Sequence, residues 1–217
     1  TRPCTKHNFL VRNIEELAST IKEAFHIARS GRPGPVLVDL PKNVMAAQYD
    51  YDPTNIKIRN HEAVYKPAPK KMANVFDMLN AAKKPLIMTG GGVILGKASE
   101  ELTLLARKYE IPVTGTLMGL GSFPGTDPLW LGMLGMHGTY YANMAVSHCD
   151  FMLAVGVRFD DRVTGSIETF AANAKIVQID IDPSSINKNV TVDLPIIGDT
   201  RATLKDILRF LEEHHYT

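Results

Sequence analysis

Short apolar runs alternate with amphipathic segments from residue 70 onwards. Apolar runs, which are typical of buried strands, occupy residues 85–89, 111–114, 151–155, 175–181 and 194–197. Apolar residues three or four positions apart predict helices at residues 71–81, 98–109, 140–148, 184–188 and 200–211. Strands that alternate with helices favour a parallel sheet covered on both faces. The predicted fold class is therefore α/β, a Rossmann-like doubly wound parallel sheet with right-handed crossovers.

The first 69 residues show a different pattern. Residues 14–29 have helical spacing, and residues 35–40 form an apolar run that Pro41 ends. One helix and one strand do not bury enough apolar surface to make a domain. We therefore expect a truncated helix-strand unit at residues 1–45, which ends a preceding domain. A linker at 46–69 and the main domain at 70–217 follow it.

Composition and charge argue against several classes of protein. Hydrophobic residues make up 45% and charged residues 22% of the chain, which is typical of a globular domain. The formal net charge of +1 predicts no basic surface for nucleic acid. No apolar run approaches the ~20 residues that span a bilayer, and no signal peptide is visible, so we expect a cytoplasmic protein without a membrane partner. The seven His and two Cys residues are scattered, so we expect no metal site.

Glycine or polar residues follow the predicted strands of the main domain. Gly90 to Gly92 follow the first strand, Thr116 the second, Gly156 the third, Asp180 ends the fourth and Asp199 follows the last. The carboxyl ends of parallel strands meet at one edge of a sheet, where ligands bind. Glycine at such an edge lets main-chain N–H groups approach a phosphate. The pattern favours a ligand the size of a nucleotide.

Several of these residues also have a structural explanation. Asp180 suits a ribose hydroxyl or an adenine amine, or an N-cap, for which Asp182 is better placed. Asp199 equally suits an N-cap of the following helix. Arg158 suits a diphosphate or a planar ring, or an ion pair with a neighbouring aspartate.

Methionines and one histidine flank the glycine turns. The thioethers of Met118, Met133 and Met136 suit packing on an aromatic ring or ordinary filling of the core. His137 lies in a loop too rich in glycine for a routine core histidine, which makes it a candidate ligand contact.

Four motifs resemble the acetohydroxyacid synthase (acetolactate synthase) family of thiamine diphosphate enzymes. They are TLMGLGSFP at residues 116–124, GMLGMHGT at 132–139, VGVRFDDRVTG at 155–165 and GRPGPVLVDLP at 31–41. The second and third motifs resemble acetohydroxyacid synthase specifically. The last resembles the end of the pyrimidine-binding domain, and the resemblance runs nearly end to end.

The resemblance implies a central domain that binds FAD, which plays no redox part in the family's main reaction. That reaction condenses pyruvate with a second 2-ketoacid in branched-chain amino acid biosynthesis. By resemblance, the flavin contacts are Arg32, Gly91, Thr116, Leu117, Leu134, Gly135, Met136, His137, Gly156, Val157, Arg158, Asp160, Asp180, Ile181, Asp199 and Thr200.

The resemblance also places Arg162 at the substrate channel, where its guanidinium is expected to hold the carboxylate of the second ketoacid. Its alternative is a surface ion pair. Asp161 and Met136 match neighbours of the channel. No catalytic residue is expected within the chain, since the family binds thiamine diphosphate and magnesium in its first and third domains. We thus expect those domains as partners, in a homodimer or tetramer with a possible regulatory subunit, and an inactive isolated fragment.

Two other functions remain open from the residue patterns. An NAD-dependent oxidoreductase has the same fold but needs G-x-G-x-x-G after a strand, and the glycines at 90–92 lack that spacing. A non-catalytic nucleotide sensor needs only the strand-end loops.

Overall fold

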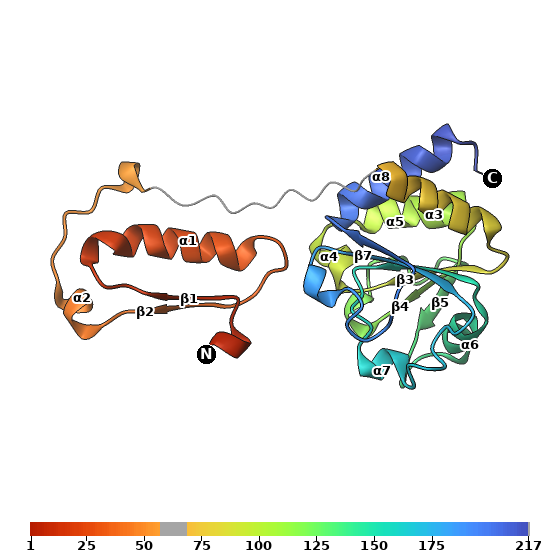
Figure 1. Cartoon of the computed structure of the whole chain (residues 1–217), viewed down its shortest axis with the longest axis horizontal. Helices are drawn as coiled ribbons and strands as arrows, with labels where there is room; N and C mark the ends of the chain where they lie inside the picture. Colours follow the sequence, from red (N-terminus) through yellow and green to blue (C-terminus); the bar gives the residue numbers. More distant parts are fainter. Residues whose placement is uncertain (57–68, 217) are drawn as a thin grey trace. The chain divides into compact units, whose positions relative to one another are not determined.

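The computed structural model describes residues 1–56 and 69–216 and divides the chain into two units, Thr1–Val64 and Tyr65–Thr217 (Figure 1). Residues 57–68 of the linker predicted at 46–69 lie outside the described part. None of the helices in the described ranges combines the length and apolar character needed to cross a bilayer.

The first unit is built as strand, helix and strand, not as the predicted helix and strand. Strand β1 (His7–Leu10) pairs in parallel with β2 (Val36–Asp39), and α1 (Leu17–Arg29) connects them. The sequence does not reveal β1, because four residues of mixed polarity carry no readable period and only the pairing with β2 defines them as a strand. The remaining elements of this unit are η1 (Arg2–Cys4), η2 (Ile14–Glu16), α2 (Lys42–Ala46) and η3 (Pro53–Asn55).

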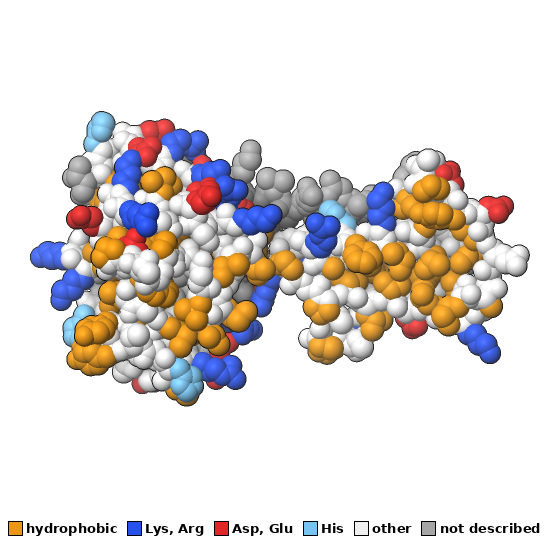
Figure 2. Space-filling view, turned by 180° about the vertical axis from the view of Figure 1, so that it is seen from behind, with side chains coloured by type: hydrophobic (Ala, Val, Ile, Leu, Met, Phe, Trp, Pro, Cys, Tyr) orange, Lys and Arg blue, Asp and Glu red, His pale blue; other side chains and the backbone are white. Residues whose placement is uncertain are grey.

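This first unit has a small core. Among its described residues, the buried apolar side chains are Val11, Ala24 and Val44. Phe25 and Met45 are instead 68% and 65% exposed, and hydrophobic side chains cover much of the face of this unit that Figure 2 shows. A two-stranded sheet with one packed helix leaves apolar surface uncovered.

The second unit contains a six-stranded parallel sheet in the order β5-β4-β3-β6-β7-β8, which confirms the predicted doubly wound α/β class. Its strands are β3 (Pro85–Thr89), β4 (Val113–Gly115), β5 (Trp130–Met133), β6 (Phe151–Val155), β7 (Lys175–Asp180) and β8 (Leu194–Ile197). The sequence does not reveal β5, because an edge strand is buried on fewer sides and carries a weaker apolar pattern.

Helices cover both faces of this sheet (Figure 1). They are α3 (Pro69–Ala81), α4 (Gly91–Leu95), α5 (Ser99–Lys108), α6 (Tyr140–His148), α7 (Asp161–Thr164) and α8 (Thr200–Glu213), with the short turns η4 (Leu117–Gly119) and η5 (Pro183–Ser185). Helices α3, α5 and α8 cover one face and α6 the other. Side chains of β3 alternate between two cores, because successive residues of a strand point to opposite faces. Ile87 packs with α3, α5 and α8, whereas Leu86 and Met88 pack with α6.

Two short helices lie where the sequence predicts only loops. Helix α4 follows β3 directly, and α7 lies in the loop after β6. Each spans only four or five residues, which is too short for a periodic pattern to be visible. The helix predicted at 184–188 is the single turn η5.

Candidate functional site

The loops that leave the parallel strands lie along one edge of the sheet and are joined by main-chain hydrogen bonds. The N–H of Thr116 donates to Thr89 O at 2.9 Å, that of Gly90 to Val155 O at 3.0 Å, that of Gly156 to Ile179 O at 2.8 Å and that of Gly198 to Asp180 O at 3.0 Å. Six strands at ~4.8 Å spacing make an edge about 24 Å long. The predicted convergence of these strand ends is confirmed, and their edge is long enough for an extended dinucleotide.

The loops after β3 and β6 meet at the centre of this edge, where the strand order reverses. A Cβ on Gly90 would lie 2.3 Å from Gly156 O, and one on Gly92 would lie 2.6 Å from Gly156 Cα. Gly156 itself has φ +61°, a conformation that favours glycine. These glycines therefore let two main chains approach at the switch point, where ligands of such sheets bind.

Large apolar side chains are exposed along the edge. Leu117 is 67%, Met118 73% and Met136 74% exposed, so Met118 and Met136 are not core-filling residues. Leu134 and Val157, by contrast, are 3% exposed and belong to the core on the α6 side. Exposed apolar side chains gathered at a strand-end edge suit a flat apolar ligand.

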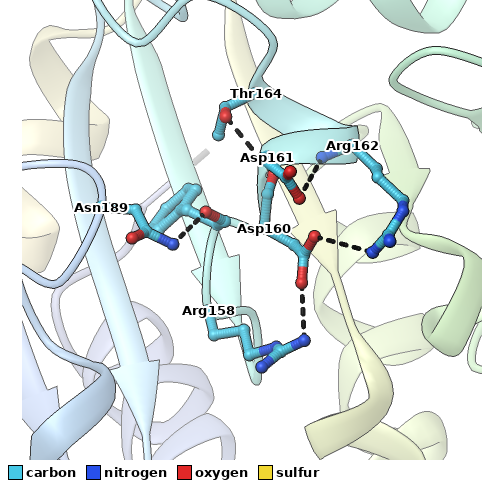
Figure 3. A network of polar contacts seen from close by, with 7 residues as sticks. Arg158, Asp160, Asp161, Arg162, Thr164 and Asn189 are labelled. Carbon is cyan, nitrogen blue, oxygen red and sulfur yellow. Dashed lines mark hydrogen bonds and ion pairs between the residues drawn. The ribbon is translucent and has the colours of Figure 1, made fainter.

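A charged network stands on the loop between β6 and α7 (Figure 3). Arg158 Nη2 lies 2.6 Å from Asp160 Oδ2, and Arg162 Nη1 lies 3.5 Å from Asp160 Oδ1. The Arg162 N–H donates to Asp161 Oδ1 at 2.9 Å. A hydrogen bond with Asp161, and then the charges of Arg158 and Arg162, hold the pKa of Asp160 below its ordinary value. The ion-pair alternative for both arginines is thus observed.

The two pairs of this network differ in strength. The Arg158 pair has the short distance of a charge-assisted hydrogen bond, whereas the Arg162 pair is longer than the usual N–H···O distance of about 2.7–3.2 Å. The Arg162 side chain is also 79% exposed. Its guanidinium is therefore held loosely and is accessible to an anion.

Aspartates at the ends of β7 and β8 act as caps. Asp182 accepts the Ser184 N–H at 2.9 Å, as its position predicts, and Asp199 caps α8 by accepting the Ala202 N–H at 2.8 Å. Asp180 Oδ1 accepts the Asp182 N–H at 2.9 Å.

Thr200 and Ile181 lie beside these caps. The hydroxyl of the buried Thr200 donates to Gly92 O at 3.2 Å and fastens α8 to the β3 loop. Ile181 is half-buried.

The loop after β5 is tied to the charged network. The Met136 N–H donates to Arg162 O at 3.1 Å, and a Cβ on Gly135 would lie 2.5 Å from the same oxygen. His137 is exposed in this loop. The structure thus brings the Gly135–His137 and Arg158–Arg162 segments together.

Two side chains that the sequence does not single out support these loops. Asn143 accepts the Gly135 N–H and donates to Gly135 O, and Asn189 donates to Phe159 O at 2.8 Å (Figure 3). An asparagine in the middle of a helix is disfavoured by propensity, and that is the signal by which Asn143 is recognisable.

Other predicted residues have separate positions. Gly91 is half-buried at the start of α4, where a Cβ would lie 3.2 Å from Met118 Cβ. Arg32 is exposed in the turn between α1 and β2 of the other unit, and its flavin contact stays a prediction. No group of three His, Cys, Asp or Glu side chains in residues 1–56 and 69–216 is placed to hold a metal ion.

Comparisons with known proteins show which family the sequence resembles. The profile of the thiamine pyrophosphate enzyme central domain matches residues 72–207. The acetolactate synthase large subunit of Haemophilus influenzae is 44% identical over 216 residues, which cover 98% of this chain and 38% of that protein. Acetolactate synthase of Arthrospira platensis is 47% identical over 96% of the chain and 37% of its own length. The probable acetolactate synthase large subunit of Methanocaldococcus jannaschii is 48% identical over 96% of the chain and 36% of its own length. The chain spans little more than a third of these relatives.

Proposed function

The chain belongs to the thiamine pyrophosphate enzyme family, and on this premise we propose that its second unit is the FAD-binding central domain of an acetolactate synthase. The first unit is then the end of the pyrimidine-binding domain, with residues 1–45 belonging to it, 46–69 forming the linker and 70–217 the central domain. Similarity to acetolactate synthases along both units supports this division.

The observation that carries the proposal is the shared edge of strand-end loops. Its length of about 24 Å suits an extended dinucleotide. The exposed side chains of Leu117, Met118 and Met136 suit a flat aromatic ring. Arg158, whose side chain is 55% exposed, has N–H groups beyond its Asp160 pair for a diphosphate. The residues present therefore fit a flavin dinucleotide.

The proposed flavin contacts share this edge or flank it, with one in the first unit. They are Arg32, Gly91, Thr116, Leu117, Leu134, Gly135, Met136, His137, Gly156, Val157, Arg158, Asp160, Asp180, Ile181, Asp199 and Thr200. The buried members of this set act through their main chains or by packing.

Arg162 is proposed to bind the carboxylate of the second 2-ketoacid, beside Asp161 and Met136. Its loose pair with Asp160 and its exposure support this role, because exchanging a 3.5 Å contact for a bidentate carboxylate strengthens its hydrogen bonding. Asp160 keeps Arg158 as its partner after that exchange.

The activity belongs to the complete polypeptide. We propose that it condenses pyruvate with a second 2-ketoacid in branched-chain amino acid biosynthesis, in the cytoplasm. Thiamine diphosphate, bound with magnesium in the further domains, supplies the carbanion chemistry. The relatives are about 2.6 times as long as the chain, which leaves room for those domains. A homodimer or tetramer, with a regulatory subunit, completes the proposal.

The test of the proposal is a titration of the purified chain with FAD, followed by quenching of flavin fluorescence. We expect one FAD per chain. Arg158→Ala is expected to weaken binding by roughly tenfold, because about 1.4 kcal/mol corresponds to the loss of a charge-assisted hydrogen bond. Arg209→Ala, an exposed arginine of α8 paired with Asp206, is the matched control.

Other outcomes favour other functions. Tight binding of ADP with no effect of FAD favours a nucleotide sensor, and a change in NADH fluorescence favours an oxidoreductase. A complete polypeptide that forms no acetolactate from pyruvate, thiamine diphosphate and magnesium contradicts the proposed activity.

A further inference from the structure

The side chain of Asn143 hydrogen-bonds both the main-chain N–H and the carbonyl of a single loop residue, Gly135, whose carbonyl also accepts the Gly138 N–H at 2.9 Å. The Gly135 N–H donates to Asn143 Oδ1 at 2.8 Å, and Asn143 Nδ2 donates to Gly135 O at 3.1 Å. The partners fix the orientation of the amide, because a main-chain N–H only donates and a carbonyl only accepts. Asn143 therefore binds both the main-chain N–H and the main-chain carbonyl of Gly135.

Gly135 has a backbone conformation that these hydrogen bonds stabilise. Gly135 has φ +93°, and a Cβ there would lie 2.5 Å from Arg162 O. Glycine is thus required, and glycine is the residue with the greatest conformational freedom to lose. The two bonds of Asn143, together with the Gly138 N–H bond to Gly135 O, hold Gly135 in this conformation.

Asn143 is itself fixed in place. It lies in the first half of α6, which Thr139 caps by accepting the Ala142 N–H at 3.1 Å. The Thr139 hydroxyl also donates to Leu131 O of β5 at 2.7 Å. The Asn143 amide is therefore carried by a capped helix attached to the sheet.

The loop that Asn143 binds is hydrogen-bonded to the charged network that contains Arg162. Next to Gly135, the Met136 N–H donates to Arg162 O at 3.1 Å. The position of Gly135 thus sets the position of Met136 and the main chain of Arg162 together, and both belong to the proposed channel and flavin edge.

We propose that Asn143 is a positioning residue, which orders residues 134–138 for flavin binding through Gly135. This inference rests on the proposed function. Asparagine alone suits the position: aspartate lacks the donor and glutamine is longer by one methylene.

The test compares FAD affinity of the 217-residue chain with that of Asn143→Ala and Asn143→Asp variants. We expect roughly tenfold weaker binding for Asn143→Ala, from two lost hydrogen bonds, and an altered visible circular dichroism of the bound flavin. Alanine favours helix more than asparagine, so helix stability alone predicts no such loss. Asn80→Ala, an exposed asparagine of α3, is the matched control.

The Asn143→Asp variant keeps the side-chain volume and the acceptor. Its second carboxylate oxygen faces Gly135 O and repels it, so we expect weak FAD binding at pH ~8. Binding should recover relative to the unsubstituted chain as the pH is lowered to the ordinary aspartate pKa of about 4 and below, because a protonated carboxyl donates as the amide does. This pH profile distinguishes positioning from a general loss of stability.

The outcomes distinguish a failure of the positioning role of Asn143 from a failure of the proposed FAD-binding function. If the unsubstituted chain binds FAD and Asn143→Ala binds it equally well with an unchanged flavin spectrum, the positioning role is wrong. If the unsubstituted chain binds no FAD, the proposed function fails and the role of Asn143 falls with it. Faster amide exchange of Gly135 in Asn143→Ala would then mark a purely structural clamp.

Discussion

Gly156 has no side chain, and this lets the main chains that follow β3 and β6 approach each other at the centre of the strand-end edge. A Cβ there would lie 2.5 Å from Gly92 Cα and 2.8 Å from Gly92 C, which are main-chain atoms that do not move aside. Its φ of +61° adds a second cost for any other residue. Both costs act on the junction of β3 and β6, where the proposed ligand binds.

Three glycine substitutions separate these costs. Gly125→Ala meets nothing within 4 Å and should change the free energy of unfolding by less than about 0.5 kcal/mol. Gly121→Ala has open space but φ +88°, and should cost about 1–2 kcal/mol. Gly156→Ala combines positive φ with overpacking, and should cost roughly 2–5 kcal/mol.

Urea unfolding followed by Trp130 fluorescence measures these changes. Trp130 is the one tryptophan of the sequence and lies in β5, so its signal reports on the second unit. Equal urea midpoints for Gly156→Ala and Gly125→Ala would contradict this prediction. They would show that the loops after β3 and β6 can move apart at a lower free-energy cost than their contacts indicate.

The roles of some single residues can be predicted from the sequence, and the roles of others cannot. Asp182 and Asp199 are recognisable as caps because a cap bonds to N–H groups two or three positions away. Asn143 is not recognisable as a clamp in this way, since its partner lies eight positions back across a turn.

At the scale of elements, helices α5 and α8 are joined by ion pairs near both of their ends. Glu101 Oε1 lies 2.7 Å from Arg201 Nε and 3.6 Å from Lys205 Nζ. Burial alone would raise the pKa of Glu101, but the hydrogen bond from Arg201 and both positive charges outweigh burial and hold this pKa below its ordinary value. The second pair, Lys108 with Glu212, is exposed.

Glu101→Gln should lower the free energy of unfolding at pH 7 by about 1–2 kcal/mol, because a buried carboxylate loses its charge-assisted bonds. The figure is kept low since water reaches Arg201, which is 42% exposed. Glu212→Gln, on the same helix pair, should have no measurable effect. Chemical denaturation of the three proteins measures both differences.

The advantage of Glu101 should depend on pH. Its pKa is lowered in the folded state, so its contribution is present above the ordinary glutamate pKa of about 4.3. That contribution is lost as the pH falls through the lower folded value. If the stability difference between the unsubstituted chain and Glu101→Gln stays constant down to pH ~3, the ion pair is not its source.

At the scale of the whole molecule, the two units differ in how much apolar surface they bury. The first has three buried apolar side chains among its described residues, while two cores flank the sheet of the second. Because burial is the main favourable contribution to folding, local opening of the first unit needs less free energy.

Hydrogen exchange followed by mass spectrometry should show this difference. Amides of β1 and β2 should exchange at least tenfold faster than those of β3 and β6, relative to their intrinsic rates, which corresponds to about 1.4 kcal/mol or more of opening free energy. Equal protection in both units would mean that they open as one cooperative body.

The sequence by itself determined the parallel α/β class and the meeting of the strand ends at one edge, and it offered caps as one of two explanations for the aspartates after β7 and β8. These depend on periodicity within an element or on bonds between near neighbours, and both are readable along a chain. It also carried the motifs by which the family is recognised.

The tertiary structure alone decided the rest. Strands β1 and β5 become strands only through pairing, and the exposure of Met118 and Met136 depends on which elements cover them. The fit of Gly92 against Gly156 joins residues 64 positions apart. Such contacts are set by the approach of distant segments, which no local pattern encodes.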